Sequence, residues 1–488
     1  MTVTLPTPAE LLPLGIPDTG ILIDGRRLAG GPGLPVRDRY TQAPVAEVAQ
    51  ATREQVMLAG RVARASVRLS PPPYERARIL GRVAELLGLQ RQAWTDLIVT
   101  EAGFPRADAA GEIDRALDTL QLCAEEAKRI GGEVVPLDGN PGQQHRLGFT
   151  LRTPVGVVCA ITPFNSPLNA VLHKLGPALA AGNAVVFKPS GFTPLSASLL
   201  CDTFLAAGLP PGLLSLVHGD AQVGQWLLEC PDIDFYTFTG STRVGEAIQA
   251  GAGLRRTQLE LGSIACTLVC ADADLDLALP KIVRASFRKA GQVCTSVQRL
   301  YVERSLAEAV RERLAAAARA LPAGDPRHEA TVVGPLITPA SAARAMGWVE
   351  EAVAGGARVH AGGTCSGAVM APTVLAGVRP GMKVLDEEIF APVVCVLAFD
   401  TLEQAIEDIN GTRFGLASGI FTQRIDRAFH AARALKVGSV YINETSSARV
   451  DGMPYGGLKD SGHGKEGPRY AIRDMMDEKV VTVSLPGL

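Results

Sequence analysis

The feature that most restricts the fold is a regular alternation of strand-like and helix-like segments that begins at Val155. Short apolar runs predict strands with amphipathic helices between them: strands over 155–161, 184–188, 213–218 and 235–238, and helices over 168–181, 195–207 and 223–230. Units of roughly 30 residues of this kind are typical of a parallel sheet wound by crossover helices. Such sheets bind ligands at the carboxyl ends of their strands. We therefore expect a ligand site in the loops that follow residues 161, 188 and 238.

A second alternating region extends from about Leu261 to Val440. Its strand-like segments lie at 267–270, 300–302, 393–399 and 439–442, each beside a segment of helical spacing. Upstream of both regions, apolar residues recur at helical spacing over 52–127, and three consecutive prolines interrupt the pattern. This stretch predicts several helices. The chain therefore predicts an α/β protein with more than one wound sheet.

The size and charge of the chain narrow the class of ligand. With 488 residues, of which 47% are hydrophobic, the chain has the material for two large domains. Its 48 basic and 50 acidic side chains give a formal net charge of −2. This balance lacks the basic excess that nucleic acid or an anionic membrane attracts. We expect the ligand to be a small molecule or a second copy of the chain.

The nine cysteines are scattered and form no Cys-x-x-Cys pair. Most lie in apolar runs such as Val157–Ala160, where a thiol is typical of a small core residue in a reducing compartment. This pattern argues against a disulfide framework and a zinc site. The chain has no apolar run of about 18 residues, and its first residues do not resemble a signal peptide. We therefore expect a cytoplasmic protein without a metal.

One cysteine differs from the others in its setting. Cys294 follows Gly291 and Gln292, where the backbone can approach a ligand closely, and it precedes the small polar residues Thr295 and Ser296. A thiolate is a strong nucleophile at neutral pH, and an aldehyde carbon is electrophilic. Cys294 is therefore a candidate nucleophile, with a buried structural cysteine as the alternative.

Glu260 is a candidate general base. It lies between Leu259 and Leu261-Gly262, an apolar and tight setting that disfavours the carboxylate charge and raises the pKa. A glutamate tuned in this way can take a proton from a thiol or from a hydrolytic water. The alternative is a solvated strand end or a helix cap, and the sequence alone does not establish that Glu260 faces Cys294.

Two loops after predicted strands hold candidate binding groups. Asn165 lies between Pro163 and Pro167, which fix the loop, so its amide is a candidate donor to an oxyanion, with an Asx-turn as the alternative. Gly240 and Ser241 join a strand to a helix start, where backbone N–H groups favour a phosphate. This turn is not the Gly-x-Gly-x-x-Gly pattern, and a Gly-Ser helix cap is common.

Together and in this order, these segments resemble the aldehyde dehydrogenase superfamily. The resemblance extends over nearly the whole chain, from Ile23-Asp24-Gly25 to the Glu466–Tyr470 tail. Further family-like segments are Lys188-Pro189-Ser190, Glu387–Phe390, and Pro454–Gly457 with Lys459, Ser461 and Gly462. The resemblance implies an oxidoreductase that uses NAD or NADP to oxidise an aldehyde to a carboxylate.

The family's architecture implies three parts. A Rossmann-like, doubly wound cofactor domain would comprise residues 1–131 and 154–259, and an α/β catalytic domain residues 260–464. Residues 132–153 and 465–488 would form a small β oligomerisation arm that pairs across subunits. A homodimer or homotetramer is therefore implied.

The resemblance also implies the catalytic roles. Cys294 matches the nucleophile, Glu260 the general base, and Asn165 the oxyanion donor, a role shared with the backbone N–H of Cys294. Thiolate attack gives a thiohemiacetal, which transfers hydride to the nicotinamide and leaves an acyl thioester. Glu260 then activates the water that hydrolyses this thioester.

The implied cofactor contacts follow the same matches. Lys188 matches a lysine that hydrogen-bonds the adenosine ribose, and Gly240 matches the turn that faces the pyrophosphate. Glu388 and Phe390 match the residues that hold the nicotinamide ribose and flank the nicotinamide ring. The whole implied set is Thr162, Pro163, Phe164, Lys188, Ser190, Gly191, Gly240, Ser241, Val244, Leu261, Gly262, Glu388 and Phe390.

Three positions depart from the family pattern. Gly191 stands where the family often has a glutamate that binds both ribose hydroxyls, so a 2′-phosphate would meet no carboxylate there and NADP should be tolerated or preferred. Ile264-Ala265-Cys266 replaces a polar residue and a proline after the Glu260 motif. Ala391 replaces a common glycine after Phe390 and could shift the nicotinamide seat.

The segments around Cys294, Arg449–Asp451 and Glu466–Tyr470 are similar to the branch of lactaldehyde, non-phosphorylating glyceraldehyde-3-phosphate and phosphonoacetaldehyde dehydrogenases. This similarity implies a small polar or anionic aldehyde. Arg449 and Arg115 are candidates to pair with a substrate anion, with a surface ion pair as the alternative for each.

Rival functions remain at this point. A CoA-acylating semialdehyde dehydrogenase would resolve the thioester with a thiol, but such an enzyme does not need the water-activating base that Glu260 supplies. A catalytically silent relative would serve as a binding or structural protein, and the intact set of Cys294, Glu260 and Asn165 argues against it. An esterase using Cys294 is a possible side activity.

Overall fold

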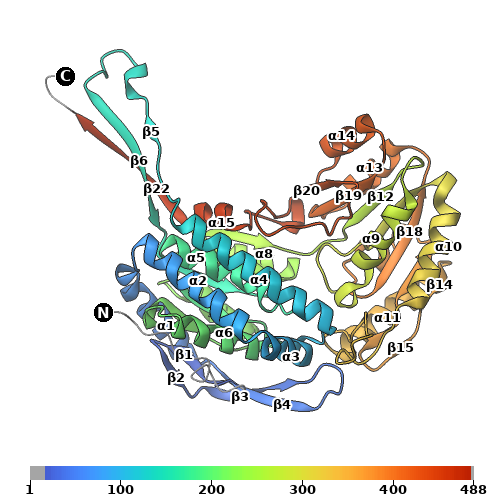
Figure 1. Cartoon of the computed structure of the whole chain (residues 1–488), viewed down its shortest axis with the longest axis horizontal. Helices are drawn as coiled ribbons and strands as arrows, with labels where there is room; N and C mark the ends of the chain where they lie inside the picture. Colours follow the sequence, from blue (N-terminus) through green and yellow to red (C-terminus); the bar gives the residue numbers. More distant parts are fainter. Residues whose placement is uncertain (1–16, 485–488) are drawn as a thin grey trace.

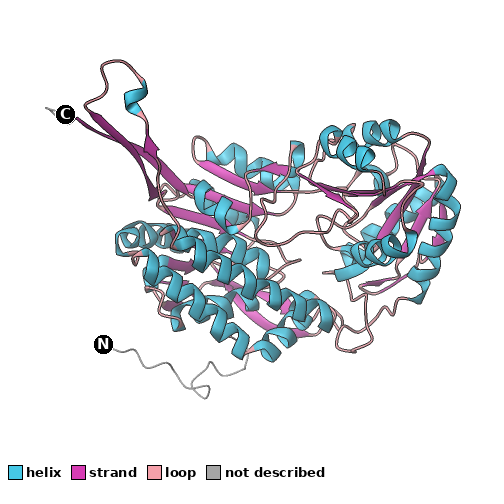
Figure 2. Cartoon of the chain, turned by 45° about the horizontal axis from the view of Figure 1, so that its top comes forward, coloured by secondary structure: helices cyan, strands magenta, loops and turns pink. Residues whose placement is uncertain are grey.

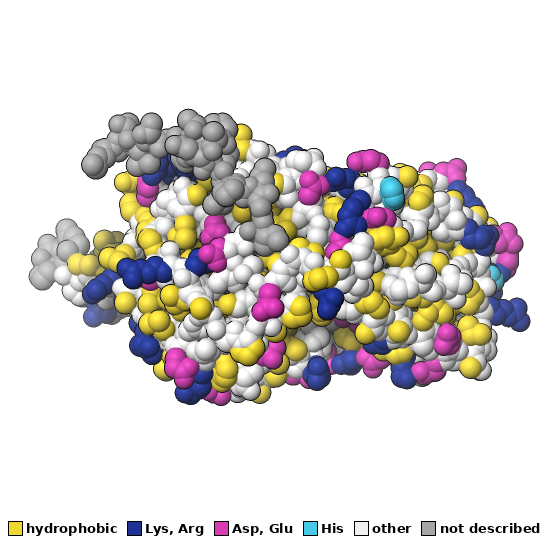
Figure 3. Space-filling view, turned by 90° about the horizontal axis from the view of Figure 1, so that it is seen from below, with side chains coloured by type: hydrophobic (Ala, Val, Ile, Leu, Met, Phe, Trp, Pro, Cys, Tyr) yellow, Lys and Arg dark blue, Asp and Glu magenta, His cyan; other side chains and the backbone are white. Residues whose placement is uncertain are grey.

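The computed structural model describes residues 17–484. The first residues, which were expected not to form a signal peptide, lie outside the described residues. The same holds for residues 1–16 of the implied cofactor domain and residues 485–488 of the implied oligomerisation arm. Two β-sheets, each flanked by helices, form the two halves of the body, and a narrow arm projects from one end (Figure 1). On the face shown in Figure 3, basic and acidic side chains are interspersed.

The first sheet has eight strands in the order β2-β1-β9-β8-β7-β10-β11-β21. Its parallel centre consists of β7 (Val157–Ile161), β8 (Ala184–Lys188), β9 (Leu214–Leu216), β10 (Phe235–Thr239) and β11 (Arg256–Glu260). The edges are antiparallel and consist of β1 (Ile21–Ile23), β2 (Arg26–Leu28) and β21 (Gly462–His463). The chain builds β7 to β9 in one direction and then adds β10 and β11 beside β7. The ends of β7 and β10 therefore lie at the switch in strand order, where such sheets bind ligands.

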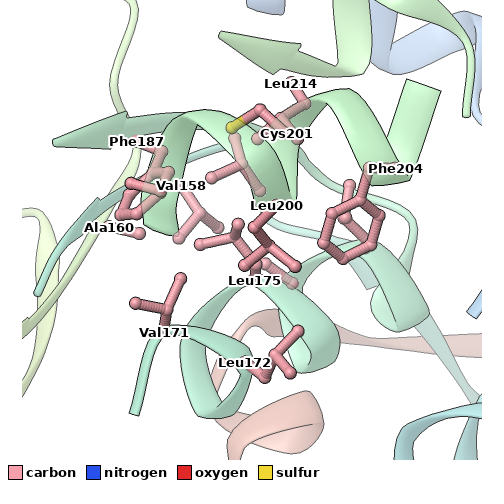
Figure 4. Close-up of a cluster of buried hydrophobic side chains, with 14 of the residues drawn as sticks. Val158, Ala160, Val171, Leu172, Leu175, Phe187, Leu200, Cys201, Phe204 and Leu214 are labelled. Atoms are coloured by element: carbon pink, nitrogen blue, oxygen red, sulfur yellow. The ribbon is translucent and has the colours of Figure 1, made fainter. Parts of the chain in front are cut away.

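Helices cover this sheet (Figure 2). The crossover helices are α5 (Asn169–Ala181), α6 (Pro194–Ala206), α7 (Ala221–Glu229) and α8 (Thr242–Ala252), and the upstream helices are α1 (Arg53–Ser66), α2 (Pro73–Leu89), α3 (Arg91–Ala102) and α4 (Arg106–Ala127). Every residue of β7 and β8 is buried, as expected for parallel strands that are covered on both faces. Figure 4 shows part of this core, where Val158 and Phe187 of the sheet lie with Leu175 of α5 and Leu200 of α6.

The second sheet has seven strands in the order β14-β17-β18-β13-β12-β19-β20 and is parallel except for the β14–β17 pair. Its strands are β12 (Cys266–Val269), β13 (Arg299–Glu303), β14 (Arg358–Ala361), β17 (Thr373–Ala376), β18 (Val393–Phe399), β19 (Ala417–Phe421) and β20 (Ser439–Ile442). Its helices are α9 (Leu275–Phe287), α10 (Arg304–Ala320), α11 (Pro339–Ala354), α12 (Lys383–Asp386), α13 (Leu402–Asn410) and α14 (Ile425–Ala434). Leu300 and Val302 of β13 belong to one apolar core and Tyr301 to another, because alternate strand residues face opposite sides.

The arm is a sheet in the order β22-β6-β5, made by β5 (Val134–Val135), β6 (Arg146–Pro154) and β22 (Met476–Ser484). β22 follows the short helix α15 (Pro468–Asp474) and pairs antiparallel with β6 from Met476 to Ser484.

Two hairpins were not predicted from the sequence: β3 (Gly31–Arg37) with β4 (Pro44–Gln50), and β15 (Cys365–Ser366) with β16 (Val369–Met370). Among residues 17–484, no helix has the length and apolar character needed to cross a membrane.

Candidate active site

A large cleft opens where the strands of the first sheet end. It has a volume of about 1110 Å³ and lies between the loops after β7, β8 and β10 and the Glu388–Phe390 segment of the second half. Of the thirteen cofactor contacts implied by the sequence, twelve line this cleft; the exception, Gly262, has a backbone close to the Glu388 carboxylate. The loops expected to hold a ligand therefore surround one cavity.

The polar groups of the cleft suit an anionic dinucleotide. The buried Lys188 ammonium has a hydrogen-bond acceptor only in Pro189 O, at 3.4 Å, among the described residues, and burial lowers its pKa to about 8. Helix α8 begins after Gly240 and Ser241, and within residues 17–484 the backbone N–H groups of its first two residues, Thr242 and Arg243, have no acceptor. A side chain at Gly191 would meet nothing within 4 Å. A bound ribose with its phosphates would therefore meet a cation, backbone donors and open space.

Glu388 and Phe390 line the part of the cleft that the resemblance predicts for the nicotinamide. Glu388 is buried, accepts a hydrogen bond from Ser263 N at 3.0 Å, and has its pKa raised to about 7, mainly by burial. Phe390 has the left-handed φ of 52°, and its ring contacts Phe164 edge to face at 5.8 Å between centroids. These contacts fix the Phe390 ring across the cleft from the loop after β7.

Cys294 lies in the loop between α9 and β13, where the large cleft meets a second cavity. Its Sγ is 3.1 Å from the hydroxyl of Tyr455, and this hydroxyl is 3.5 Å from Oε1 of Glu260, the last residue of β11. Burial raises the pKa of the Cys294 thiol well above its usual value, and the Glu260 charge adds to this. Burial also raises the pKa of Glu260 to about 7, with a contribution from Glu466.

The amide of Asn165 reaches this loop directly. Its Nδ2 donates to Gln292 O at 2.8 Å. Within residues 17–484 no backbone N–H donates to its Oδ1, so the local Asx-turn that was the alternative is not formed. The second amide hydrogen remains for a ligand, and Asn165 lines both cavities. Within residues 17–484, the backbone N–H of Cys294 has no acceptor. Two donors are therefore available beside the sulfur.

The loop before Cys294 has a strained backbone that a buried ion pair supports. Lys289 and Ala290 have left-handed φ values of 50° and 53°, each at a cost of order 1 kcal/mol. Lys289 Nζ donates to Glu112 Oε2 at 2.8 Å and to Asn165 O at 3.1 Å. Glu112 also accepts from Ser166 Oγ at 2.6 Å. This pair was not predicted from the sequence, although Glu112 lies at helical spacing among the apolar residues Ala109, Ile113 and Ala116 of α4.

Gly291 continues the same loop with a φ of 70°. A Cβ at this position would collide with the backbone carbonyl of Ala391. The Gly-Gln turn expected before Cys294 is therefore required by a close approach to the segment that follows Phe390. Ala391 itself is buried.

The second cavity has a volume of about 130 Å³ and is lined by several cations, including Arg115, Arg288 and Arg449. Arg115 forms a bidentate pair with Asp451 at 2.6 and 3.1 Å. Arg449 lies 3.0 Å from Glu466 and 4.0 Å over the Tyr455 ring. Arg288, which the sequence analysis missed, donates to Ser447 Oγ at 2.7 Å and has no carboxylate partner within residues 17–484. An unpaired cation therefore faces a small cavity beside the thiol.

Comparison with known proteins extends these observations. Residues 29–481 match the model of the aldehyde dehydrogenase family. The 3-sulfolactaldehyde dehydrogenase of Priestia megaterium is 44% identical over 467 residues, which cover 96% of this chain and 98% of that protein. Aldehyde dehydrogenase 21 of Physcomitrella patens, solved in complex with the reaction product succinate, is 36% identical with a TM-score of 0.93, covering 96% of this chain and 98% of that one. An NADP-dependent glyceraldehyde-3-phosphate dehydrogenase of Bacillus halodurans, solved with NADP, is 32% identical with a TM-score of 0.93, covering 96% and 99%.

Proposed function

This chain belongs to the aldehyde dehydrogenase family, and from that premise we propose that it oxidises a small anionic aldehyde through a thioester on Cys294. The family and the α/β fold predicted from the sequence are confirmed, and the protein is an NAD(P)-dependent aldehyde dehydrogenase. The assignment of roles is supported by one observation above all. The Cys294 thiol, the Glu260 carboxylate and the Asn165 amide meet where the large cleft joins the cationic cavity.

Each of these groups has a task in the proposed reaction. The Cys294 thiolate attacks the aldehyde carbon, and the Asn165 amide and the Cys294 N–H donate to the oxyanion that forms. Bound NAD(P) supplies the hydride acceptor. Glu260 then takes a proton from the water that attacks the thioester, which releases the carboxylate and the free thiol. A product that forms only with added CoA would contradict this hydrolytic route.

The substrate class is inferred from the smaller cavity. A cavity of about 130 Å³ has room for a small aldehyde and excludes a bulky one. The unpaired guanidinium of Arg288 favours an anion at the end of the substrate that is remote from the aldehyde. The 3-sulfolactaldehyde dehydrogenase and the succinate complex among the relatives agree with a sulfonate or carboxylate there. A panel of anionic and neutral aldehydes of equal length, followed by absorbance of reduced cofactor, tests this proposal.

Arg288→Gln should lower kcat/KM for the anionic aldehydes by roughly 10- to 100-fold, because one charge-assisted hydrogen bond is lost. The value for neutral aldehydes of the same length should change little. Arg284→Gln is the matched control, since Arg284 lies one turn earlier on α9 with an exposed side chain. Equal losses for charged and neutral aldehydes would show that Arg288 acts on the fold of the loop and not on the substrate charge.

We propose that NADP is accepted at least as well as NAD. Open space at Gly191 and the Arg39 guanidinium, which donates to the backbone carbonyl of the neighbouring Phe192, both favour a 2′-phosphate. Gly191→Glu should lower kcat/KM for NADP by roughly 100-fold through charge repulsion, while that for NAD is kept or improved. Gly191→Gln, which has the same size without the charge, should affect NADP far less. A wild-type enzyme with a strong preference for NAD would contradict this proposal.

The assembly and the compartment are also proposals. The arm exposes apolar side chains on β5, β6 and β22: Val134, Leu147, Leu151, Val480 and Val483. Such a surface favours pairing with a second copy of the chain, as a homodimer or homotetramer. All nine cysteines are free thiols, which favours the reducing cytoplasm.

A further inference from the structure

A tyrosine hydroxyl lies between the sulfur and the carboxylate of the proposed site. Tyr455 Oη is 3.1 Å from Cys294 Sγ and 3.5 Å from Glu260 Oε1, and Tyr455 is buried. The three groups form a continuous path from S–H through O–H to a carboxylate oxygen. We propose that Tyr455 is a further catalytic residue, which relays the thiol proton to Glu260. This inference rests on the proposed roles of Cys294 and Glu260.

The proton and charge balance of the relay is simple. The S–H bond of Cys294 breaks as its proton bonds to Tyr455 Oη, while the original phenolic proton moves to Glu260. The tyrosine is neutral before and after the step. A negative charge moves from the carboxylate to the sulfur, so the net charge of the buried site does not change. Glu260 must then lose its proton to water before it can activate the hydrolytic water.

Charge conservation explains why a relay is useful here. Burial and the Glu260 carboxylate both raise the pKa of the Cys294 thiol, so a thiolate beside an ionised Glu260 would be costly. The cost falls if Glu260 is neutralised in the same step. The thiol and the carboxylate therefore titrate as one coupled unit.

The position of Tyr455 is fixed by rigid neighbours. Its backbone exchanges hydrogen bonds with Glu466, from Tyr455 N to Glu466 O at 3.1 Å and from Glu466 N to Tyr455 O at 2.7 Å. The Arg449 guanidinium lies 4.0 Å over its ring. A cation at this place stabilises negative charge on the phenolic oxygen as the proton passes. Arg449 thus has a role in positioning Tyr455 that does not require a substrate anion.

The test follows the rate at which iodoacetamide alkylates Cys294 as a function of pH, with Cys294→Ala as the background. This reaction needs neither aldehyde nor nucleotide, so it remains informative if the proposed substrate class or the oxidation itself fails. Tyr455→Phe should slow alkylation at neutral pH by roughly 10- to 100-fold. Tyr441→Phe is the matched control, because Tyr441 Oη donates to Met453 Sδ at 3.8 Å and, among the described residues, has no hydrogen bond to Cys294 or Glu260.

Two results separate a relay from a structural or binding role. In a Glu260→Gln background, Tyr455→Phe should have no further effect on alkylation, since the relay has already lost its acceptor. In the wild-type protein, the alkylation rate should depend non-linearly on the deuterium fraction of the solvent, because the thiol proton and the phenolic proton move together. Additive mutant effects, a straight-line deuterium dependence, or normal alkylation with a loss only in aldehyde KM would each overturn the relay.

Discussion

Cys294→Ala is expected to abolish aldehyde oxidation, with kcat reduced on the order of 10⁵-fold or more. Hydride can leave only from a tetrahedral carbon, and the sulfur is the group that creates this carbon from the aldehyde. The Asn165 amide and the backbone N–H beside it then have no oxyanion to stabilise. Absorbance of the reduced cofactor at saturating aldehyde measures the loss.

The fold of this variant should remain intact, because Cys294 is only half-buried and lies against cavities on two sides. Cys270→Ala is the matched control: that thiol is buried in the core of the second sheet, so its loss should cost about 1 kcal/mol of stability and leave activity unchanged. Thermal unfolding measures both variants. Oxidation by Cys294→Ala at a rate near that of the wild type would mean that another group forms the adduct.

The parts of the fold that the sequence predicted well are those whose burial is uniform. β7 and β8 are fully buried, so their apolar runs stand out between glycine and proline boundaries. β11 was missed because Arg256–Glu260 is largely polar and only its last residues are buried. The β3–β4 hairpin was missed because its strands contain glycine and proline and are mostly exposed.

The residues of the candidate site also differ in how far the sequence alone indicated them. Cys294, Glu260 and Asn165 were candidates from their local settings, and their roles were implied by the family resemblance. The structure brings all three to the same two cavities. Tyr455 and Arg288 act through contacts between residues that are 161 and 159 positions apart, and no local pattern reports such a meeting. The charges of Arg115 and Arg449 were visible in the sequence, but their carboxylate partners Asp451 and Glu466 depend on tertiary contacts.

Glu260→Gln is expected to separate the two halves of the reaction. Hydrolysis of the thioester should slow by about 10²–10⁴-fold, because the attacking water loses its base. Formation of the thioester should be less affected, since the thiol can also lose its proton to solvent at higher pH. Rapid mixing with aldehyde and nucleotide should then give one burst of reduced cofactor followed by slow turnover, and mass spectrometry should find acylated Cys294. A variant with hydrolysis at the wild-type rate would remove Glu260 from this role.

The pH dependence gives an independent measure of the same group. Glu260 is a base only as the carboxylate, and its pKa is raised to about 7, mainly by burial. The rate of hydrolysis in the wild type should therefore increase as the pH rises through about 7 and level off above it, and Glu260→Gln should lose this step. Glu101→Gln is a stringent control, because burial also raises the pKa of Glu101 to about 7, yet this carboxylate accepts hydrogen bonds at the start of α6. Replacement of Glu101 should leave the pH profile of hydrolysis unchanged. If only Glu260→Gln loses the increase in rate near pH 7, that increase reflects the carboxylate beside Cys294 and not buried carboxylates in general.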